Sequence, residues 1–400
     1  MNSLRLTLAS FLAYFALSGT LAPIGILAAP AALALNVSVA EMVRTLGLFS
    51  TGTLIGSVTA LFLLGRVPLR RLVLGIYGIA SACLIALLVF AVDLWLVGSA
   101  LIVLGVCLGV GLAQAALVIS RLYLEGRRAS MLVATDASFS LAGFSLASLS
   151  VALLAREFSW TLSYVAVLFA VLTVMAIALV SDYPDEPENF NDEDVGRYSS
   201  AKIVGFWRTC PKAVWLLTAA LFFYTLGQTS MLIWLPGFAQ ESLGLSSPSA
   251  GQLVGNYWFG MFIGQLLTVG IVLRVGVSKV VVAGALGCLL GALLLTWVDV
   301  PGISLLQIAI FWGVLNFGLL KCVISLASEL FDVVPAILVS SMLLSASFGT
   351  ALSPWLSSWF VEAGGKALGL GFGQLGLGCV LLLVCFAIFT KSRSIEETHG

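Results

Sequence analysis

Long apolar runs separated by short polar segments dominate this chain of 400 residues. About twelve of these runs reach the ~18 residues that a membrane-spanning helix needs. They lie close to residues 6–33, 42–64, 69–92, 95–121, 129–154, 159–181, 212–238, 248–273, 278–298, 302–327, 333–358 and 368–390. The first run is too long for a signal peptide and has no convincing cleavage site, so we interpret it as the first span. The pattern predicts an all-α integral membrane protein with twelve transmembrane helices.

The composition supports this class and argues against others. Hydrophobic residues make up 60% of the chain and charged residues 10%, whereas soluble domains carry about 25% charged residues. The formal net charge is zero, so nothing in it favours a nucleic-acid partner. The seven cysteines form no CxxC pair, and the single histidine, His399, lies in the tail. With no metal-ligand cluster and no nucleophile beside a base, we expect neither an enzyme nor a bound cofactor.

An acidic segment divides the chain into two halves. Residues 181–202 carry seven aspartates and glutamates and two prolines, which is too polar to bury. We therefore predict an N-terminal six-helix bundle over 1–181, a cytoplasmic linker over 182–211 and a C-terminal six-helix bundle over 212–400. The short basic loops "LLGRVPLRRLV" and "LRVGVSKVVV" occupy matching places in the two halves. This repetition suggests a tandem duplication, an organisation known among secondary transporters.

The basic residues predict the orientation in the membrane. With both termini cytoplasmic, 15 of the 19 lysines and arginines lie on the cytoplasmic side and 3 on the opposite side, while Lys321 lies within a span. The positive-inside rule favours this arrangement. We expect a multi-pass protein of the cell inner membrane with both termini in the cytoplasm.

Several stretches resemble one transporter family. The twelve spans, the acidic central segment and the basic loops resemble the major facilitator superfamily. Within it, "ATDASFSLAG" (134–143), "YTLGQTSMLIWLPGFAQESLGLS" (224–246) and "AGQLVGNYWFGMFIGQ" (250–265) are similar to the TsgA-type family, a relative of the fucose permease group. The loop at 65–71 lacks the aspartate and second glycine usual in the superfamily. The resemblance implies the major facilitator fold and alternating access between two six-helix bundles.

The resemblance also bears on coupling and on the solute cavity. Ala22 and Gln114 align by eye with two proton-coupling carboxylates of the fucose permease group, and neither can titrate. Gln114 and Gln228 suit either a solute contact or a bond to a neighbouring helix, since both uses satisfy a buried amide. Tyr14 and Ser18 are further candidates for the cavity lining. The candidate substrate-binding residues are Gln114, Tyr224, Gln228, Asn256, Trp258, Asn316 and Lys321.

Small residues mark the helix faces that we expect to pack together. Ser341, Ser345, Gly349 and Ser353 follow one another at spacings of four, and Gly251, Gly255, Gly260 and Gly264 line another span. In the superfamily fold, the second, fifth, eighth and eleventh helices lie where the two halves meet. We therefore expect these faces at the contact between the halves.

Asp136 and Lys321 are charges inside apolar spans. Each lies roughly 10 Å deep from the cytoplasmic side, counted at the helical rise. Lys321 shares a helical face with Gly318, Ser325 and Ser328, which favours protein or water over lipid; snorkelling of its long side chain to the interface is the alternative. We hypothesise that the two residues pair in the outward-open state and separate when the cytoplasmic side opens.

The expected function is secondary active transport of a small polar solute, with protons as coupling ion. Lys321 favours an anionic or zwitterionic solute, and Asp136 is the remaining candidate for proton coupling or gating. The alternatives are a facilitative uniporter, an exporter without proton coupling, a channel, or a membrane receptor or scaffold that transports nothing. We expect a monomer whose partners are the lipid bilayer and the solute.

Overall fold

The computed structural model describes residues 2–64, 66–123, 125–184, 200–297, 304–331 and 335–399. The first part contains α1 (Asn2–Leu21), α2 (Ile24–Leu35), α3 (Val39–Leu63), α4 (Leu69–Phe90), α5 (Leu94–Leu122), α6 (Glu125–Leu154), the 3-10 helix η1 (Trp160–Tyr164) and α7 (Val165–Val180). The second part contains α9 (Ser200–Thr209), α10 (Lys212–Leu243), α11 (Ser247–Val275), α12 (Val277–Trp297), α13 (Leu305–Leu315), α14 (Leu319–Ser328) and α15 (Ala336–His399).

The helices confirm the predicted twelve-span membrane fold. Within the described part of the chain, ten helical segments are long and apolar enough to cross a membrane. The last of these covers 337–391 and has non-helical backbone at Gly364 and Gly365, so it provides two spans. α11 adds another, because its 29 residues reach about 43 Å at the helical rise.

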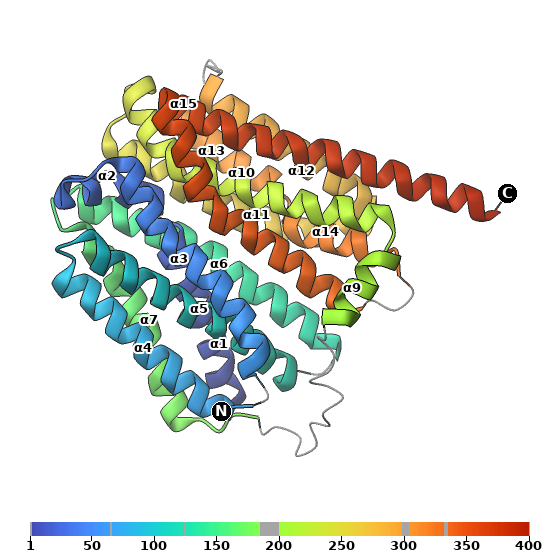
Figure 1. Ribbon diagram of the computed structural model, residues 1–400, viewed down its shortest axis with the longest axis horizontal. Helices are drawn as coiled ribbons and strands as arrows, with labels where there is room; N and C mark the ends of the chain where they lie inside the picture. The colour runs from blue at the N-terminus through green and yellow to red at the C-terminus, as the bar shows by residue number, and fades with distance from the viewer. Residues whose placement is uncertain are drawn as a thin grey trace.

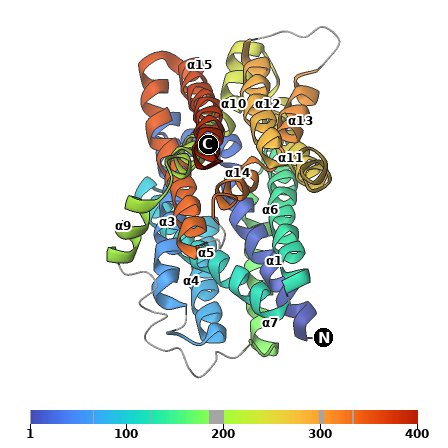
Figure 2. The same cartoon turned by 90° about the vertical axis from the view of Figure 1, so that its right-hand side faces the viewer.

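The spans gather in two bundles (Figure 1). α1 to α7 form one bundle and α10 to α15 the other, and α6 of the first lies against α11 of the second (Figures 1 and 2). Residues 185–199 of the predicted linker lie outside the described residues. The exact limits at 181 and 212 stay a prediction. We name the two membrane faces as the basic residues predict, cytoplasmic and periplasmic.

Two of the predicted spans are broken, which corrects the expectation of continuous helices over 6–33 and 302–327. The first span changes direction at Pro23, between α1 and α2. Proline has no amide hydrogen, and its ring clashes with the preceding turn. The other span breaks between α13 and α14, where Phe317 (φ 48°) and Gly318 (φ 55°) both adopt left-handed backbone. A bulky residue rarely adopts this conformation, so the surrounding packing must hold it.

Glycines let matching helix pairs approach closely in both halves. In the N-terminal half, a Cβ atom at Gly52 would overlap the carbonyl of Ile102, and one at Gly105 would overlap that of Phe49. In the C-terminal half, a Cβ at Gly260 would overlap the Ile310 carbonyl. The pairs are α3 with α5 and α11 with α13, the second and fourth spans of each half. This correspondence fits the predicted duplication.

The predicted small-residue faces serve two different contacts. On α11, Gly251 and Gly255 pack against Val151 and Ser148 of the N-terminal half, as expected. Gly260 and Gly264 instead abut α13 of their own half, so for them the expectation is wrong. The expectation is wrong for α15, where Ser345 donates to the Thr218 carbonyl at 2.9 Å and Gly349 abuts α10. That face of α15 packs against α10 within the C-terminal bundle. Small residues permit close packing but do not choose the partner, since any nearby helix gains from it.

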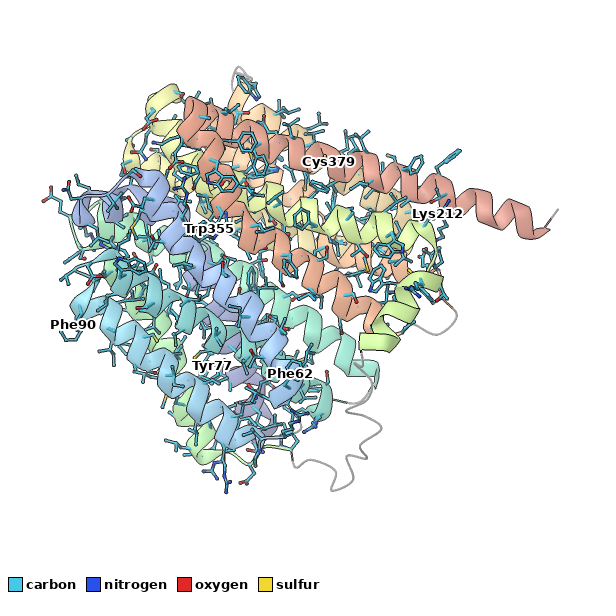
Figure 3. The ribbon with its side chains drawn as sticks, viewed as in Figure 1. Phe62, Tyr77, Phe90, Lys212, Trp355 and Cys379 are labelled. Carbon is cyan, nitrogen blue, oxygen red and sulfur yellow. The ribbon has the colours of Figure 1, made fainter. Side chains whose placement is uncertain are left out.

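Large apolar side chains cover the outside of the bundles. Phe90, at the end of α4, projects outward, whereas Tyr77 of the same helix lies inside the N-terminal half (Figure 3). Trp95, Trp297 and Trp359 are also exposed. Tryptophan is enriched at membrane interfaces, where one edge of the ring contacts lipid and the other water. This exterior is that of a multi-pass membrane protein.

Candidate functional site

A cavity of about 180 Å³ lies between the two halves. The N-terminal half contributes residues on both sides of the Pro23 break and Phe139 of α6, and the C-terminal half contributes the rest. Its lining is Leu21, Ala22, Ile24, Gly25, Phe139, Tyr224, Thr225, Gln228, Thr229, Leu232, Ile233, Trp258, Met261, Leu320 and Thr350. Because both halves form its wall, rocking one half against the other would change access to it.

A buried hydrogen-bond network forms one side of the cavity. The Asn316 amide nitrogen donates to the hydroxyls of Tyr224 (2.8 Å) and Tyr257 (2.7 Å). The Tyr224 hydroxyl donates to Asn316 Oδ1 at 3.0 Å, and Gln228 Nε2 also donates to the Tyr257 hydroxyl. The network joins α10 and α11 to the break between α13 and α14. Buried polar groups that bond one another fix the positions of their helices.

The broken helix explains why Asn316 can form this network. α13 ends at Leu315, and the left-handed residues Phe317 and Gly318 redirect the chain into α14. Asn316 Oδ1 also accepts from the backbone N–H of Leu319 at 3.3 Å, the start of the new helix. Asparagine is suited to such positions because its short side chain bonds nearby backbone groups. One residue thus links the helix break to the cavity wall.

Trp258 differs from the other polar residues of the lining. Its side chain is 5% exposed, and its indole Nε1 has no hydrogen-bond partner among the described residues. The ring packs edge-to-face on Phe139 with 5.6 Å between centroids, and it leaves no room for a Cβ atom at Gly143 of α6. A buried N–H without a partner costs about 1–3 kcal/mol. No described residue satisfies this N–H, although Trp258 belongs to the cavity lining.

The structure brings only some of the predicted site residues to the cavity. Tyr224, Gln228 and Trp258 line it, and Asn316 lies behind them in the network. Asn256 instead donates to the Leu306 carbonyl at 3.0 Å and so ties α11 to α13. Gln114 is buried in α5 and is not part of the lining.

Two further sequence candidates also lie outside the lining. Tyr14 and Ser18, both on α1, are not among the residues that form the cavity wall, although their helix reaches it at Leu21. Helix periodicity places a residue on a face but does not say which neighbour that face meets. Their place in the fold is therefore set by packing against the other helices of the N-terminal half.

Other residues of the site were not among the sequence candidates. Tyr257, Phe139, Met261 and Thr229 all belong to the network or the lining. Tyr257 precedes Trp258 within the motif-like stretch 250–265, which is the one signal that pointed near it. Phe139 and Met261 are ordinary apolar residues in apolar spans. They lie in the stretches 134–143 and 250–265 that resemble the TsgA-type family, but their apolar side chains do not distinguish them from lipid-facing neighbours.

Asp136 and Lys321 form an ion pair between the two halves. Lys321 Nζ of α14 lies 3.0 Å from Asp136 Oδ2 of α6, so the predicted proximity of these two residues is confirmed. The Lys321 side chain is 57% exposed and that of Asp136 23%. Nearby, Ser140 donates to Gln265 Oε1 at 3.0 Å, again between the halves. At this exposure the pair contributes about 0–1 kcal/mol, less than a buried pair would.

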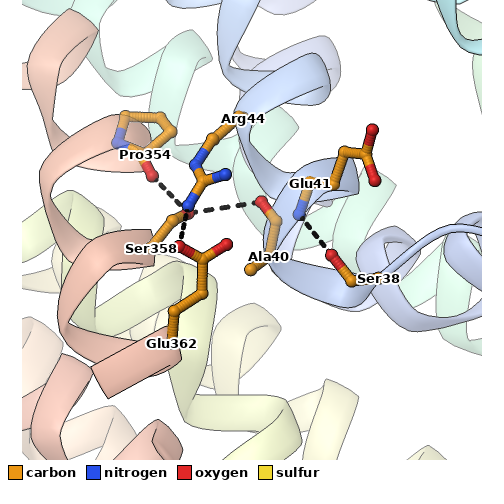
Figure 4. A network of polar contacts seen from close by, with 7 residues as sticks. All are labelled: Ser38, Ala40, Glu41, Arg44, Pro354, Ser358 and Glu362. Carbon is orange, nitrogen blue, oxygen red and sulfur yellow. Dashed lines mark hydrogen bonds and ion pairs between the residues drawn. The ribbon is translucent and has the colours of Figure 1, made fainter. Parts of the chain in front are cut away.

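A second ion pair joins the halves on the predicted periplasmic face. Arg44 of α3 contacts the carboxylate of Glu362 of α15 (Figure 4). Beside it, Ser358 donates to the Ala40 carbonyl at 3.3 Å, and a Cβ at Gly47 would overlap Pro354. Neither charged residue was a sequence candidate, because each sits near a span end where charges are common.

The halves are thus in contact on both sides of the cavity. The sequence-based hypothesis is that Asp136 and Lys321 pair in the outward-open state and separate when the cytoplasmic side opens. Here the pair forms while Arg44 contacts Glu362 and Gly25 packs against the backbone of Leu232 and Ile233 on the other face. The pair is thus also present with the predicted periplasmic face closed, and its separation on cytoplasmic opening stays a prediction.

The amino-acid sequence is similar to those of known membrane proteins. Residues 6–342 match the sequence profile of the Major Facilitator Superfamily. The chain is 28% identical over 404 aligned positions to a protein TsgA homolog of Yersinia pseudotuberculosis, covering 100% of this chain and 98% of the relative. A TsgA homolog of Yersinia pestis matches with the same identity and coverage.

Solved structures with low sequence identity share the fold. A D-xylose-proton symporter superposes with a TM-score of 0.72 at 15% identity, covering 97% of this chain and 96% of the symporter. The nucleoside transporter NupG gives 0.72 at 14% identity, covering 98% and 99%. The two-bundle fold and the match over most of the length lead to one conclusion: the chain belongs to the Major Facilitator Superfamily of membrane transporters.

Proposed function

We propose that this protein is a secondary active transporter that moves a small solute across the cell inner membrane by alternating access. The observation that carries the proposal is the cavity walled by both halves, with a cross-half ion pair on each side of it. Such a cavity can open to one face at a time if the halves rock about it. The N-terminal bundle over 1–181, the linker over 182–211 and the C-terminal bundle over 212–400 are the moving parts of this proposal.

The two ion pairs are the proposed gates. Separation of Asp136 from Lys321 would accompany opening to the cytoplasm, and separation of Arg44 from Glu362 would accompany opening to the periplasm. Both pairs are partly exposed, so each is weak enough to break during a cycle. States that differ by a few kcal/mol interconvert readily, and contacts of this size are sufficient to bias them.

Protons are the proposed coupling ion, and Asp136 is the proposed carrier. The chain carries Ala22 in the cavity lining and Gln114 in α5, where the resemblance to the fucose permease group implies carboxylates. Asp136 is a carboxylate within a span that has a partner in the opposite half. Protonation would remove its attraction to Lys321 and so favour separation of the halves on that face.

The function is tested with purified protein in proteoliposomes. A library of small metabolites is applied under an inward proton gradient while a trapped pH dye reports proton entry. Saturable, solute-dependent acidification that Asp136→Asn abolishes, with counterflow exchange retained, is the expected result. A non-saturating flux would indicate a channel, and uptake without proton entry a uniporter. Absence of flux for every compound would favour a receptor or scaffold.

The orientation is tested separately. A reporter fused after Gly400 and a second one within 182–211 are both expected to read as cytoplasmic. A periplasmic reading at either position would overturn the assignment of the two faces.

A further inference from the structure

The wall of the central cavity carries no charge. Among the residues that line it, none is aspartate, glutamate, lysine, arginine or histidine, and leucine, isoleucine, alanine and aromatic residues predominate. Taking a charge out of water costs several kcal/mol unless a counter-charge compensates it. A charged solute would therefore need a partner from outside this wall.

The charged pair next to the lining does not supply that partner. Leu320 lines the cavity, but the adjacent Lys321 directs its ammonium to Asp136 across the gap between the halves. The pair is neutral as a whole. In this structure the Lys321 ammonium lies 3.0 Å from the Asp136 carboxylate, which already compensates its charge.

Most polar groups of the wall already have partners. The Thr225 and Thr350 hydroxyls both donate to the Ala346 carbonyl, at 2.6 and 3.2 Å. The Tyr224 hydroxyl donates to Asn316, and Gln228 Nε2 donates to Tyr257. The indole N–H of Trp258 is buried and unpartnered within the described chain. A solute can bond to it, as to the lining hydroxyl of Thr229, without breaking another bond of the wall.

We infer that the solute is uncharged and that the Trp258 N–H selects it by donating to one of its acceptor atoms. This inference rests on the proposed function, because it assigns the solute class to the same cavity. The acceptor is a carbonyl, ether or hydroxyl oxygen or a ring nitrogen, and the remaining surface of the solute is apolar or aromatic to match Phe139 and Leu232. It replaces the anionic or zwitterionic solute expected from Lys321. A volume of about 180 Å³ suits a compact molecule, since drug-sized ligands occupy roughly 300–1,000 Å³.

The first test measures the charge preference of the cavity with thiol reagents. Thr229 in the lining is replaced by cysteine in a background without the seven free native cysteines. The probes are butyl methanethiosulfonate, which is neutral, and its sulfonatoethyl (anionic) and trimethylammonioethyl (cationic) analogues of similar size. Each rate is divided by the rate with a free thiol. We expect both charged probes to react at least about tenfold more slowly than the neutral one, the equivalent of 1.4 kcal/mol.

A control cysteine separates the two possible failures. Ser325→Cys lies on the exposed face of α14 and should react with all three probes. If the anionic probe labels Thr229→Cys as fast as the neutral one, the solute class is wrong and the transporter proposal stands. If Ser325→Cys reacts but no probe reaches Thr229→Cys, the cavity is not on a solute path and the proposed function itself fails.

The second test examines the indole N–H. Purified protein is screened by thermal shift against pairs of neutral and anionic isosteres such as benzamide and benzoate, because a ligand of the folded state raises Tm. We expect neutral members to raise Tm and Trp258→Phe, which removes only the N–H donor and part of the ring, to lose the shift. Trp234→Phe is the control, since that indole donates to Ser357 at 2.9 Å and lies outside the central cavity. A shift that survives in Trp258→Phe, or one caused only by the anionic members, would overturn the inference.

Discussion

The two halves of this transporter share their packing but break different helices. In each half the second and fourth spans cross through apposed glycines, as α3 with α5 and α11 with α13. In the N-terminal half the fourth span, α5, is continuous over 29 residues, and the first span breaks at Pro23. In the C-terminal half the first span, α10, is continuous despite Pro236, and the fourth breaks after Asn316. Each half thus contains one of these two helix breaks, in the first span of the N-terminal half and in the fourth span of the C-terminal half.

The glycine contacts, which pack the bundle, occur in both halves, whereas the helix breaks, which shape the site, fall in different spans. Residues on both sides of the Pro23 break line the cavity, and Asn316 at the other break holds the network behind it. Irregular backbone within a membrane is tolerated only where protein or water surrounds it. The two breaks therefore meet at the cavity, whereas the glycine contacts can repeat in both halves because they serve packing alone.

The largest expected effect comes from removing the amide at the broken fourth span. Asn316→Ala leaves the hydroxyls of Tyr224 and Tyr257 without this partner, at about 1–3 kcal/mol for each buried group. We expect a clear loss of thermal stability and more than a tenfold loss of transport. Gln114→Ala, at the continuous fourth span, is the matched variant and should cost less. Equal losses in both variants would contradict the distinction between the halves.

Packing should respond alike in the two halves. Gly105→Ala and Gly260→Ala each place a methyl group against a backbone carbonyl, so we expect each to destabilise the protein by about 1–3 kcal/mol. Gly378→Ala on α15, where a Cβ meets nothing within 4 Å, should be neutral or slightly stabilising. Thermal unfolding in detergent provides the measurement. A large effect in one half and none in the other would argue against equivalent crossings.

The left-handed backbone of the α13–α14 break can be tested without changing its contacts. A Cβ at Gly318 meets only Gln265 Cγ at 3.7 Å, so there is room for an alanine side chain. The cost of Gly318→Ala therefore comes from the left-handed backbone, with a φ of 55°, alone. We expect about 1–2 kcal/mol of destabilisation. Gly371→Ala, which also has open space, serves as the control for a helical glycine. An unchanged Tm for Gly318→Ala would mean that the break adopts another conformation.

The smallest effects are expected at the gates. Lys321→Ala and Arg44→Ala should each shift the balance of states by up to about 1 kcal/mol, or about fivefold, in opposite directions. Labelling of Ser325→Cys by a membrane-impermeant reagent from the predicted cytoplasmic side should rise with the first substitution and fall with the second. The swap Asp136→Lys with Lys321→Asp should partly restore the wild-type rate. Unchanged labelling and transport in Lys321→Ala would mean that Lys321 is not part of a gate and that its side chain only extends to the membrane–water interface.

The membrane class, the spans and the polar residues within them could be predicted from the amino-acid sequence. These follow from local properties, because lipid demands long apolar helices wherever they lie in the fold. Tyr224, Gln228 and Trp258 were identified in this way, as was the proximity of Asp136 and Lys321 through their similar depth. Each of these inferences needed only helix geometry and the known arrangement of the bundles.

Which polar residues meet depends on how helices far apart in the sequence pack together. Asn256 and Trp258 are two positions apart, yet one bonds α13 and the other faces the cavity. Arg44 and Glu362 come from opposite ends of the chain and touch because the halves pack together. The break at Asn316 likewise depends on Tyr224 and Tyr257, which hold the amide in place. A helical period assigns residues to faces, but packing between distant helices assigns those faces to lipid, to another helix or to the solute.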